Sequence, residues 1–472
     1  MATLSLAGPS YSLRNRVADA QRCINWVPVQ IESGAGKGAA PGYLKQCPGK
    51  VQIADFGVEI RGLWLARGVL YAVAGAGLYR ISNAWTATLL ATLSSTNGMI
   101  SMADNNTQLC VVAGADGYVL DLDTGLVTVL SNSTPNWRGS YTVDVIDGYG
   151  VFTEPDSYQI YTSGPQDFTA LNPLDFGSAE SSTGPIIAHI VKHREVLILK
   201  DRTGEVWFDA GNADGIPLSP NMGAAIEVGC LATHSLQKIA GTAFWLGRDV
   251  SGASVVFAMS AYVPQRISTH ALEELLSPLT EAQLSGATAY TYHQEGLSYY
   301  ALQVPGVSTT WVYELAGGIW HERAEFSAGQ YQKDAAVVHA FAYGVHVVGD
   351  LVGKLYRLDT AVNTSNGAPM VRERVTPHNA TPGSNIKRFG SFQVDCNVGL
   401  GLSGADGKLM LRYSNDGGIT WGHWRDLTLG NIGEYRARAR ATMLGHARDR
   451  VWSIRVSDNI RCEPVNALID EV

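Results

Sequence analysis

The stretch TQLCVVAGADGYVLDLDTGLVTVL, residues 107–130, holds three strand-like segments separated by two tight turns. Gly and Asp accept the positive φ that a tight hairpin requires, so a turn such as GADG at 114–117 joins two strands of one sheet. The same pattern recurs at least six times, and an apolar or aromatic anchor marks the second strand of each hairpin at intervals of 40 to 56 residues. These anchors are Tyr79, Val119, Ile160, Trp207, Phe257, Tyr313 and Tyr356. Repeated strands at this period, without helices, are typical of a β-propeller.

We therefore predict an all-β protein with three parts. Residues 60–360 form a β-propeller of about seven blades, with six to eight left open because the period is irregular. Residues 1–59 do not follow the repeat and predict an extended N-terminal arm that leads into the first blade. Residues 361–472 begin with the linker-like AVNTSNGAP and predict a small antiparallel β-sandwich domain. Its strands are expected at 370–376, 388–398, 408–414, 435–444 and 450–457, and one helix is expected at 269–284.

Composition narrows the classes of protein that fit. The 51 glycines and 17% charged residues suit a turn-rich β protein. Apolar stretches are interrupted by Gly, Arg and polar residues, so no membrane span is predicted, and the N-terminus lacks the features of a secretory signal. The six cysteines show no metal-binding spacing, which favours reduced and mostly buried thiols over disulfides or zinc ligands.

Charge is distributed unequally along the chain. Residues 371–472 contain 14 Lys and Arg and 11 Asp and Glu, a balance of +3, whereas residues 1–370 contain 21 and 32, a balance of −11. Arginine outnumbers lysine 25 to 10, and arginine favours fixed bidentate contacts in interfaces. The two regions therefore differ in electrostatic character.

One motif suggests an enzyme class. SNDGGITW at 414–421 fits the Asp-box pattern S-x-D-x-G-x-T-W, through Ser414, Asp416, Gly418, Thr420 and Trp421. The carboxylate and hydroxyl of such a box bond the backbone of a hairpin turn, and the Trp covers it. The motif resembles the boxes of sialidases, but those enzymes carry several boxes within the blades and an arginine cluster. A single box outside the repeat favours a role in the turn itself.

A second motif is the basic run RARARA at 436–441. On a strand it places Arg436, Arg438 and Arg440 on one face and alanines on the other. Such a face is solvated, packs in a subunit interface, or contacts nucleic acid. The net negative charge of the whole chain weighs against tight DNA binding.

No catalytic signature emerges from the remaining residues. We find no nucleophile elbow, HExxH, phosphate-binding Gly loop or closely spaced carboxylate pair in the sequence. His189 and His193 lie four residues apart on a predicted strand and would share one face, which permits a metal site, although plain outer positions of a strand are the simpler interpretation. No enzyme activity, cofactor or metal is predicted.

Many segments together resemble the packaged-DNA stabilisation proteins of short-tailed bacteriophages, also called tail hub, nozzle or head-completion proteins. The resemblance covers almost the whole chain in the same order. It rests on GPSYSLRNRVADAQRCINWVPV (8–29), the PG of QCPGK, PDSYQIYTSGP, LDFGSAESS, GEVWFDAG, IEVGC, FWLGRDVSG, VPQRIST, TTWVYELAGGIWHER and GDLVGKLYRLD (349–359). The residues that match the family's amino-terminal pattern are Asn25, Trp26, Pro28, Pro48 and Gly49.

The resemblance implies a structural protein of the virion tail, made in the host bacterial cytoplasm. Members of that family form a ring, expected here to hold six copies, below the portal and its adaptor. Such a ring closes the DNA exit channel, passes double-stranded DNA without sequence specificity, and carries the tail needle or distal tail protein and the tailspikes or fibres. It implies no membrane partner. The arm would suit β-augmentation or clamping onto a neighbour. Two alternatives stay open: a propeller glycosidase of sialidase type, and a monomeric Kelch-type interaction propeller suggested by WVYELAGGIWHER.

Overall fold

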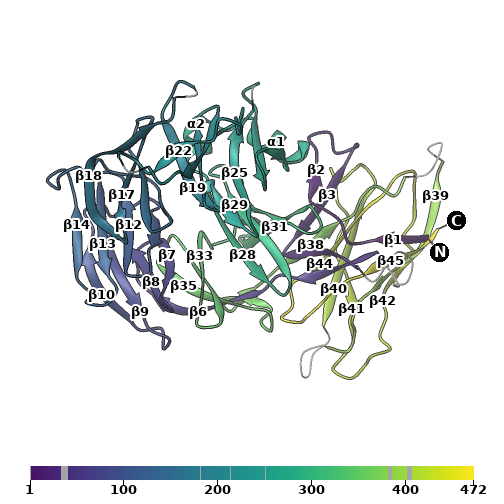
Figure 1. Cartoon of the computed structure of the whole chain (residues 1–472). Helices are drawn as coiled ribbons and strands as arrows, with labels where there is room; N and C mark the ends of the chain where they lie inside the picture. The colour runs from purple at the N-terminus through teal and green to yellow at the C-terminus, as the bar shows by residue number, and fades with distance from the viewer. Residues whose placement is uncertain are drawn as a thin grey trace.

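The computed structural model shows a propeller joined side by side to a sandwich, and both chain termini lie on the sandwich (Figure 1). It describes residues 2–32, 41–180, 182–212, 214–249, 251–380, 385–400 and 407–471. Within these ranges no helix is long and apolar enough to cross a membrane.

The propeller has seven blades, each an antiparallel sheet, which confirms the expected number. Every predicted anchor, from Tyr79 to Tyr356, lies in the third strand of a different blade. The first four blades are β7 (Ile60–Ala66), β8 (Val69–Ala74), β9 (Gly77–Ile81), β10 (Ala87–Thr92); β11 (Ser101–Asp104), β12 (Gln108–Ala113), β13 (Asp116–Asp121), β14 (Val127–Leu130); β15 (Val143–Ile146), β16 (Tyr149–Thr153), β17 (Gln159–Pro165), β18 (Asp167–Ser178); and β19 (Ile186–Lys192), β20 (Glu195–Lys200), β21 (Gly204–Asp209), β22 (Leu218–Pro220).

The last three blades complete the ring. They are β24 (Gln237–Ile239), β25 (Thr242–Arg248), β26 (Ser254–Met259), β27 (Gln265–Arg266), with the short β23 (Gly229–Cys230) also on β25; β28 (Thr288–Gln294), β29 (Leu297–Gln303), β30 (Thr310–Glu314), β31 (Ile319–Ser327), extended by β32 (Gln330–Lys333); and β33 (Val338–Ala342), β34 (Val345–Gly349), β35 (Lys354–Asp359), β6 (Gly49–Asp55). The innermost strands neighbour one another around the axis, and β33 of the last blade packs against β7 of the first.

The circle of seven blades is closed by a strand from the N-terminal region. β6 pairs antiparallel with β35, with Gly49 opposite Asp359 and Asp55 opposite Lys354. These residues run on into β7 of the first blade, and on the way β6 supplies the outer strand of the seventh blade, which was not predicted. Pairing strands from opposite ends of the repeat satisfies an edge that would otherwise be open.

The apolar cores of the propeller lie between neighbouring blades. Tyr71 and Leu78 of the first blade, for example, form one buried cluster with Val111 and Tyr118 of the second. The single helix predicted at 269–284 is instead two, α1 (His270–Leu276) and α2 (Glu281–Ser285), besides the 3-10 turn η1 (Thr233–Ser235). Pro278 lies between them and has no N–H for a continuous helix, and Thr280 starts α2 with a capping box.

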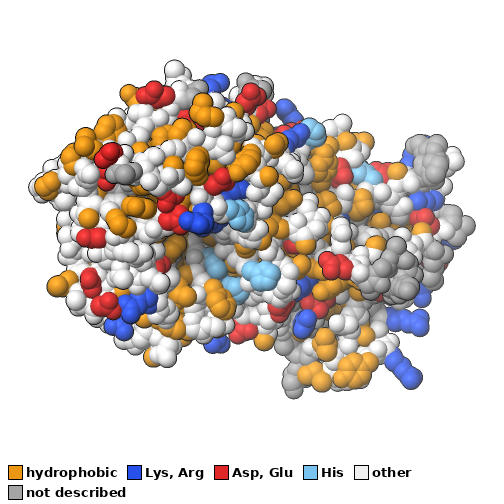
Figure 2. Space-filling view, in the orientation of Figure 1, with side chains coloured by type: hydrophobic (Ala, Val, Ile, Leu, Met, Phe, Trp, Pro, Cys, Tyr) orange, Lys and Arg blue, Asp and Glu red, His pale blue; other side chains and the backbone are white. Residues whose placement is uncertain are grey.

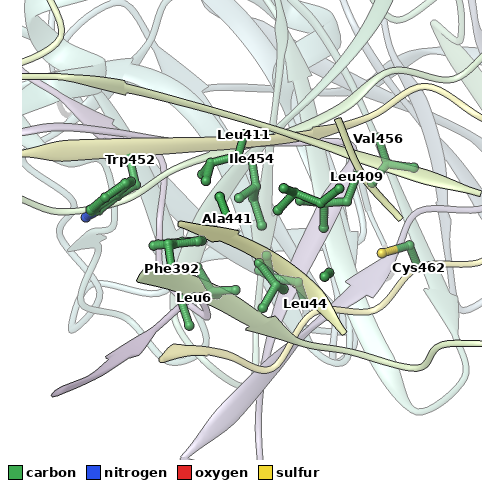
Figure 3. Packing of buried hydrophobic residues seen from close by; sticks show 14 of the residues in the cluster. Leu6, Leu44, Phe392, Leu409, Leu411, Ala441, Trp452, Ile454, Val456 and Cys462 are labelled. Atoms are coloured by element: carbon green, nitrogen blue, oxygen red, sulfur yellow. The ribbon is translucent and has the colours of Figure 1, made fainter. Parts of the chain in front are cut away.

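The C-terminal region is a β-sandwich, as predicted, but it incorporates N-terminal strands. One sheet has the order β1 (Ala2–Ser5), β45 (Asn466–Glu471), β39 (Lys387–Asp395), β42 (Ala439–Thr442), with β43 (His446–Ala447) also on β39. The facing sheet has the order β3 (Ala20–Ile24), β38 (Arg372–Val375), β44 (Val451–Val456), β40 (Lys408–Ser414), β41 (Arg425–Thr428). Between them Phe392, Leu411, Trp452 and Ile454 form a buried core (Figure 3).

The N-terminal arm is thus folded and not extended. β1, β3 and β6 pair within the same chain, and the remaining short strands are β2 (Tyr11–Ser12), the hairpin of β4 (Trp26–Gln30) and β5 (Gly42–Gln46), and β36 (Thr364–Ser365) with β37 (Ala368–Pro369). Residues 33–40 lie outside the described ranges. The domain boundaries 1–59, 60–360 and 361–472 stay a proposal. In the structure, the strands of residues 1–59 are divided between the propeller and the sandwich.

Candidate functional site: the domain junction and the basic edge

β3 connects the two domains through hydrogen-bonded backbone. It pairs antiparallel with β38 of the sandwich and parallel with β31 of blade six, where Ile24 is the partner of both Glu373 and Glu322. Blade six and one sandwich sheet therefore form one continuous sheet. Because a continuous sheet shares its hydrogen bonds across the boundary, the two domains are held as one unit.

Asn25 and Trp26 of the family motif lie at this junction. The Asn25 side-chain amide donates to the carbonyls of Ala324 and Val371, both at 2.8 Å, and its side-chain oxygen accepts from Ala324 N at 3.0 Å. Asn25 has a φ of +56°, a conformation that Asn tolerates better than most residues. Trp26 is fully buried, and its indole N–H donates to the Cys462 carbonyl at 2.9 Å.

The other motif residues shape the path of the chain into the closing strand. Pro28 lies in β4 opposite Leu44. Pro48 precedes β6, and Gly49 begins it. A Cβ at Gly49 would lie 2.4 Å from the Val362 carbonyl oxygen, so only glycine permits this approach. These contacts are structural, and the motif's role in function stays a prediction.

A buried carboxylate on the propeller side of the junction binds groups from the arm. Glu322, 2% exposed, accepts from the Arg22 guanidinium at 2.5 and 3.0 Å, from Ser10 Oγ at 2.9 Å and from Thr309 Oγ1 at 2.8 Å. Burial raises the pKa of Glu322, but Arg22 and these hydrogen bonds outweigh it and hold the pKa below its ordinary value. The ion pair is therefore maintained inside the protein.

A second buried carboxylate lies on the sandwich side. Glu373, 3% exposed, accepts from Arg455 at 2.6 and 3.1 Å, from Arg412 at 2.9 Å, and from the hydroxyls of Tyr331 at 2.6 Å and Ser453 at 2.7 Å. Burial raises the pKa of Glu373, and the neighbouring Arg455 with the other donors lowers it overall. Tyr331 comes from β32 of the propeller side, so this cluster also spans the boundary.

Lys50 forms a third buried ionic contact, in the closing strand. Its ammonium pairs with Asp334 and Glu325, and Ser365 Oγ also donates to Glu325 at 2.8 Å. Lys50 itself is 5% exposed. Removing one partner of such a buried set leaves an uncompensated charge, which is strongly destabilising.

The Asp-box residues form a closed hydrogen-bonded turn after β40. Asp416 accepts from Ser414 Oγ at 2.6 Å and from the backbone N–H groups of Ile419 and Thr420 at 3.1 and 2.9 Å, while Ser414 Oγ accepts from Gly418 N at 2.8 Å. Hydrogen bonds from Ser414 and then Thr420 lower the pKa of Asp416 to about 2. The geometry matches the turn predicted from sequence, with Asp416 exposed and engaged by its own turn.

The box tryptophan connects this turn to the junction. Trp421 donates from its indole N–H to the Gly418 carbonyl at 3.1 Å, and the Arg412 guanidinium lies 4.5 Å from its ring centroid. Arg412 also lies 4.2 Å from the ring of Trp424, and it is one of the donors to Glu373. The turn therefore helps to hold an arginine of the buried cluster.

The basic run does not form the continuous strand that was predicted. β42 begins only at Ala439, so Arg440 lies on the strand, Arg438 precedes it and Arg436 lies in a turn. All three side chains are exposed, and within the described ranges none forms an ion pair; Arg440 donates to Ser391 Oγ at 3.0 Å. Figure 2 shows Lys and Arg side chains projecting from the sandwich end of the molecule. We call Arg436, Arg438 and Arg440 the basic edge.

The predicted histidine pair is not brought together. His189 is buried, and its ring contacts Thr142 Oγ1 at 2.7 Å and the Val151 carbonyl at 3.1 Å. β19 ends at Lys192, so His193 lies in a turn with a φ of +49° and contacts the Gly241 carbonyl instead. In the part of the chain that the structure describes, no group of three or more His, Cys, Asp or Glu side chains is placed to hold a metal.

A cavity of about 320 Å³ lies on the propeller axis and is lined by the innermost strands of all seven blades. Within this cavity the Lys238 ammonium donates hydrogen bonds to the Asp144 carboxylate at 2.7 Å and to the Val191 carbonyl at 2.8 Å. It is too small for duplex DNA, whose major groove alone is about 12 Å wide.

Sequence reasoning missed the buried ionic clusters of the junction. The signal was present in IWHERAEF and VRERV, where charged residues interrupt otherwise apolar strands. Every residue of β38, Arg372–Val375, is buried. Charges inside a strand that is covered on both faces indicate ionic partners, but not which residues these are.

Comparison with known proteins identifies the family. A family model described as "Bacteriophage P22 Gp10, beta-propeller" matches residues 20–363, and another described as "Bacteriophage P22 Gp10, beta-sandwich" matches residues 372–470. No curated protein matches the chain.

Several solved structures are similar to this chain at low sequence identity. The computationally designed Ika8 protein is 15% identical, with 72% of this chain and 100% of that one covered and a TM-score of 0.39. The WD40 β-propeller domain of Doa1 is 12% identical, with 66% and 96% covered and a TM-score of 0.39. The N-terminal domain of Nup159 is 9% identical, with 66% and 94% covered and a TM-score of 0.40.

The two family models follow one another along the chain and correspond to the propeller and the sandwich of the structure. This confirms the resemblance drawn from sequence. The chain belongs to the family of bacteriophage P22 Gp10, a phage stabilisation protein, and is a structural protein of a bacteriophage tail.

Proposed function

We propose that this protein is the tail hub or nozzle of its phage and forms a closed ring, with six copies expected, below the portal and adaptor. The ring closes the DNA exit channel and stabilises the packaged DNA. It also anchors the needle or distal tail protein and the spikes or fibres. The protein is made in the host cytoplasm and acts in the virion.

The observation that carries this proposal is the fusion of propeller and sandwich into one unit through β3. A component that holds pressurised DNA needs parts that do not move relative to each other. The continuous sheet and the buried carboxylates Glu322 and Glu373 supply that property. Such a unit suits a ring that bears load.

The size of the axial cavity supports a ring over a single copy. A cavity of about 320 Å³ is too small for duplex DNA, which supports a DNA channel that lies between protomers. The basic edge supplies a contact for this assembly, since its arginines lack ionic partners within the described ranges and residues 1–370 carry a balance of −11. We therefore place the basic edge against an acidic surface of a neighbouring propeller, and expect a channel wall that is neutral or acidic.

The test replaces Arg436, Arg438 and Arg440 together by Ser and measures ring assembly on purified portal and adaptor complexes by mass photometry. The variant should assemble poorly, while any weak binding to DNA changes little. Replacement of the same residues by Lys keeps the charge but loses the bidentate geometry, and should be intermediate. Arg194→Ser, at an exposed pair with Asp147 on the propeller, is the control and should assemble normally.

An intact ring together with a loss of salt-dependent DNA affinity would move the basic edge from the interface to the channel wall. A stable monomer on the portal complex would favour the Kelch-type interaction module. The glycosidase alternative has no support from the box geometry, because the Asp416 oxygens accept hydrogen bonds from their own turn.

A further inference from the structure

A loop of the N-terminal arm, residues 13–19, is held against both domains. Arg14 N donates to the Glu274 carboxylate of α1 at 2.8 Å on the propeller side, where α1 lies beside β2 (Figure 1). On the sandwich side, the His378 ring contacts the Arg16 carbonyl through Nε2 at 2.9 Å. Because contacts from both domains fix its backbone, the loop presents its side chains from a defined position.

This loop forms one wall of a groove with a volume of about 1320 Å³, and α1 and residues 306–309 form further walls. The volume exceeds the range of about 300–1,000 Å³ that is usual for small-molecule sites. The groove therefore has room for a segment of polypeptide. We call it the arm groove and define it by six of its lining residues: Leu13, Arg14, Arg16, Leu275, Val307 and Trp311.

The charges of the arm groove are only partly matched within the chain. Three carboxylates line it, and each accepts a hydrogen bond from another residue of the protein: Glu273, Glu274 and Glu322. By contrast, Arg14 and Arg16 are exposed, and neither forms an ion pair with any residue that the structure describes. The Arg16 guanidinium has one long contact, to the Gly418 carbonyl at 3.5 Å. Two guanidinium groups are therefore left to bind carboxylates from outside the chain.

The arm groove also has apolar walls. Leu275 of α1 is 42% exposed, and Leu13 of the arm loop is half-buried. Val307 and Trp311 line the groove from the propeller, where both belong to one buried apolar cluster. A partner that fills the groove therefore has to bring apolar side chains as well as carboxylates.

We propose that the arm groove binds an extended acidic segment of another protein, whose carboxylates pair with Arg14 and Arg16. The apolar side chains of that segment pack on Leu13 and Leu275. Nucleic acid suits this surface less well, because its closely spaced phosphates would lie beside the three carboxylates of the groove. This inference goes beyond the proposed function and does not depend on it, since a single copy of the chain contains the whole groove.

The experiment measures, by fluorescence anisotropy, the binding of a fluorescein-labelled octapeptide of alternating Glu and Leu to the purified full-length protein. Binding should saturate and weaken as salt is raised, and a peptide of alternating Lys and Leu should not bind. Hydrogen exchange with the peptide bound should show protection in residues 12–16 and in α1. Arg14→Ser combined with Arg16→Ser should bind about tenfold more weakly. This double variant keeps the Arg14 N–H that Glu274 accepts, so the loop stays in place.

The matched control removes two exposed arginines elsewhere on the propeller, Arg194→Ser combined with Arg202→Ser, and so changes the net charge equally. It should bind the peptide as the parent does. The proposal would be overturned if the parent showed no binding at peptide concentrations up to about 1 mM, or if the Arg14 and Arg16 variant bound as tightly as the parent. Protection confined to residues outside the groove would also overturn it. So would a short DNA duplex that displaces the peptide at a lower concentration than unlabelled peptide does, because the groove would then be a phosphate site.

Discussion

The propeller and the domain junction are stabilised in different ways. The cores between blades are made of apolar and aromatic side chains such as Tyr71, Leu78 and Val111. The junction instead buries Glu322 and Glu373 with their arginine partners. Apolar packing tolerates small shifts, whereas a buried ion pair is stable only in one geometry. The junction is therefore the part that fixes how the propeller and sandwich are oriented.

The largest effect is expected at Glu322. Glu322 is 2% exposed and forms an ion pair with Arg22. Glu322→Ala therefore leaves the Arg22 guanidinium without its buried carboxylate partner. The free energy of unfolding should fall by about 3–5 kcal/mol, and calorimetry should separate the unfolding of the sandwich from that of the propeller.

The control is Asp123→Ala, which removes the partner of Arg67 in an exposed pair. It should change the free energy of unfolding by less than about 1 kcal/mol. If Glu322→Ala unfolds in one transition at the parent's temperature, the junction is not what couples the domains.

Lowering the pH should destabilise the propeller at a higher pH than it destabilises the domain junction. Burial lowers the pKa of His189 to about 4 and that of His339 to about 3, so both are neutral in the folded propeller. The unfolded chain takes up these protons below about pH 6.5, and the propeller therefore loses stability as the pH falls from there towards 4. The junction carboxylates have lowered pKa values, so their contribution is lost only below their unfolded value near 4.5.

Urea titrations between pH 7 and 4 measure this order. His189→Gln should remove part of the slope between pH 6.5 and 4, on the order of 3 kcal/mol, since one pKa unit corresponds to about 1.4 kcal/mol. An unchanged slope in that variant would show that His189 is protonated in the folded state as readily as in the unfolded one.

A smaller effect is expected where β6 closes the circle of propeller blades by pairing with β35. Gly49→Ala would place a Cβ 2.4 Å from the Val362 carbonyl oxygen and 2.6 Å from that of Thr364. The resulting shift of β6 should cost about 1–3 kcal/mol and expose the amides of β35 to hydrogen exchange. Gly223→Ala is the control, because its Cβ would meet only Asn221 Oδ1 at 3.5 Å. Equal stability of both variants would indicate that the closing strand can move without loss.

The smallest effect is expected at the Asp-box. Asp416→Ala removes the acceptor for Thr420 N and Ile419 N, but the turn is exposed and water replaces it. The free energy of unfolding of the sandwich should fall by about 1 kcal/mol. The control is Asp426→Ala, in the exposed pair with Lys408, which should leave this free energy almost unchanged. A parent protein that hydrolyses a sialoside, and an Asp416→Ala variant that does not, would contradict the role in the turn.

The repeat was predictable because its signals are local. Alternating strands and Gly or Asp turns depend on neighbouring residues, and the anchors from Tyr79 to Tyr356 therefore identified all seven blades. The strand β45 and the folding of the N-terminal arm were missed, because β1 and β6 find their partners, β45 and β35, about 300 to 470 residues away in the sequence. Local pattern carries no information on such partners.

The candidate site was predictable only in part, for a similar reason. The Asp-box was recognised because its hydrogen bonds lie within one turn. Arg436 was assigned to a strand because alternation extends into the turn before Ala439. Glu322 and Glu373 were overlooked because their partners, including Arg22 and Arg455, come from strands that only the fold brings together.

The most direct test of the proposed tail role is an electron cryomicroscopy reconstruction of the native particle at a resolution that shows side chains. We expect a closed ring of this chain, with six copies, between the portal and adaptor and the distal tail. The propeller and sandwich of each copy should keep the mutual orientation set by β3, and Arg436, Arg438 and Arg440 should face carboxylates of the next copy. Isolated single copies, or a ring in which the two domains have rotated apart, would contradict this account.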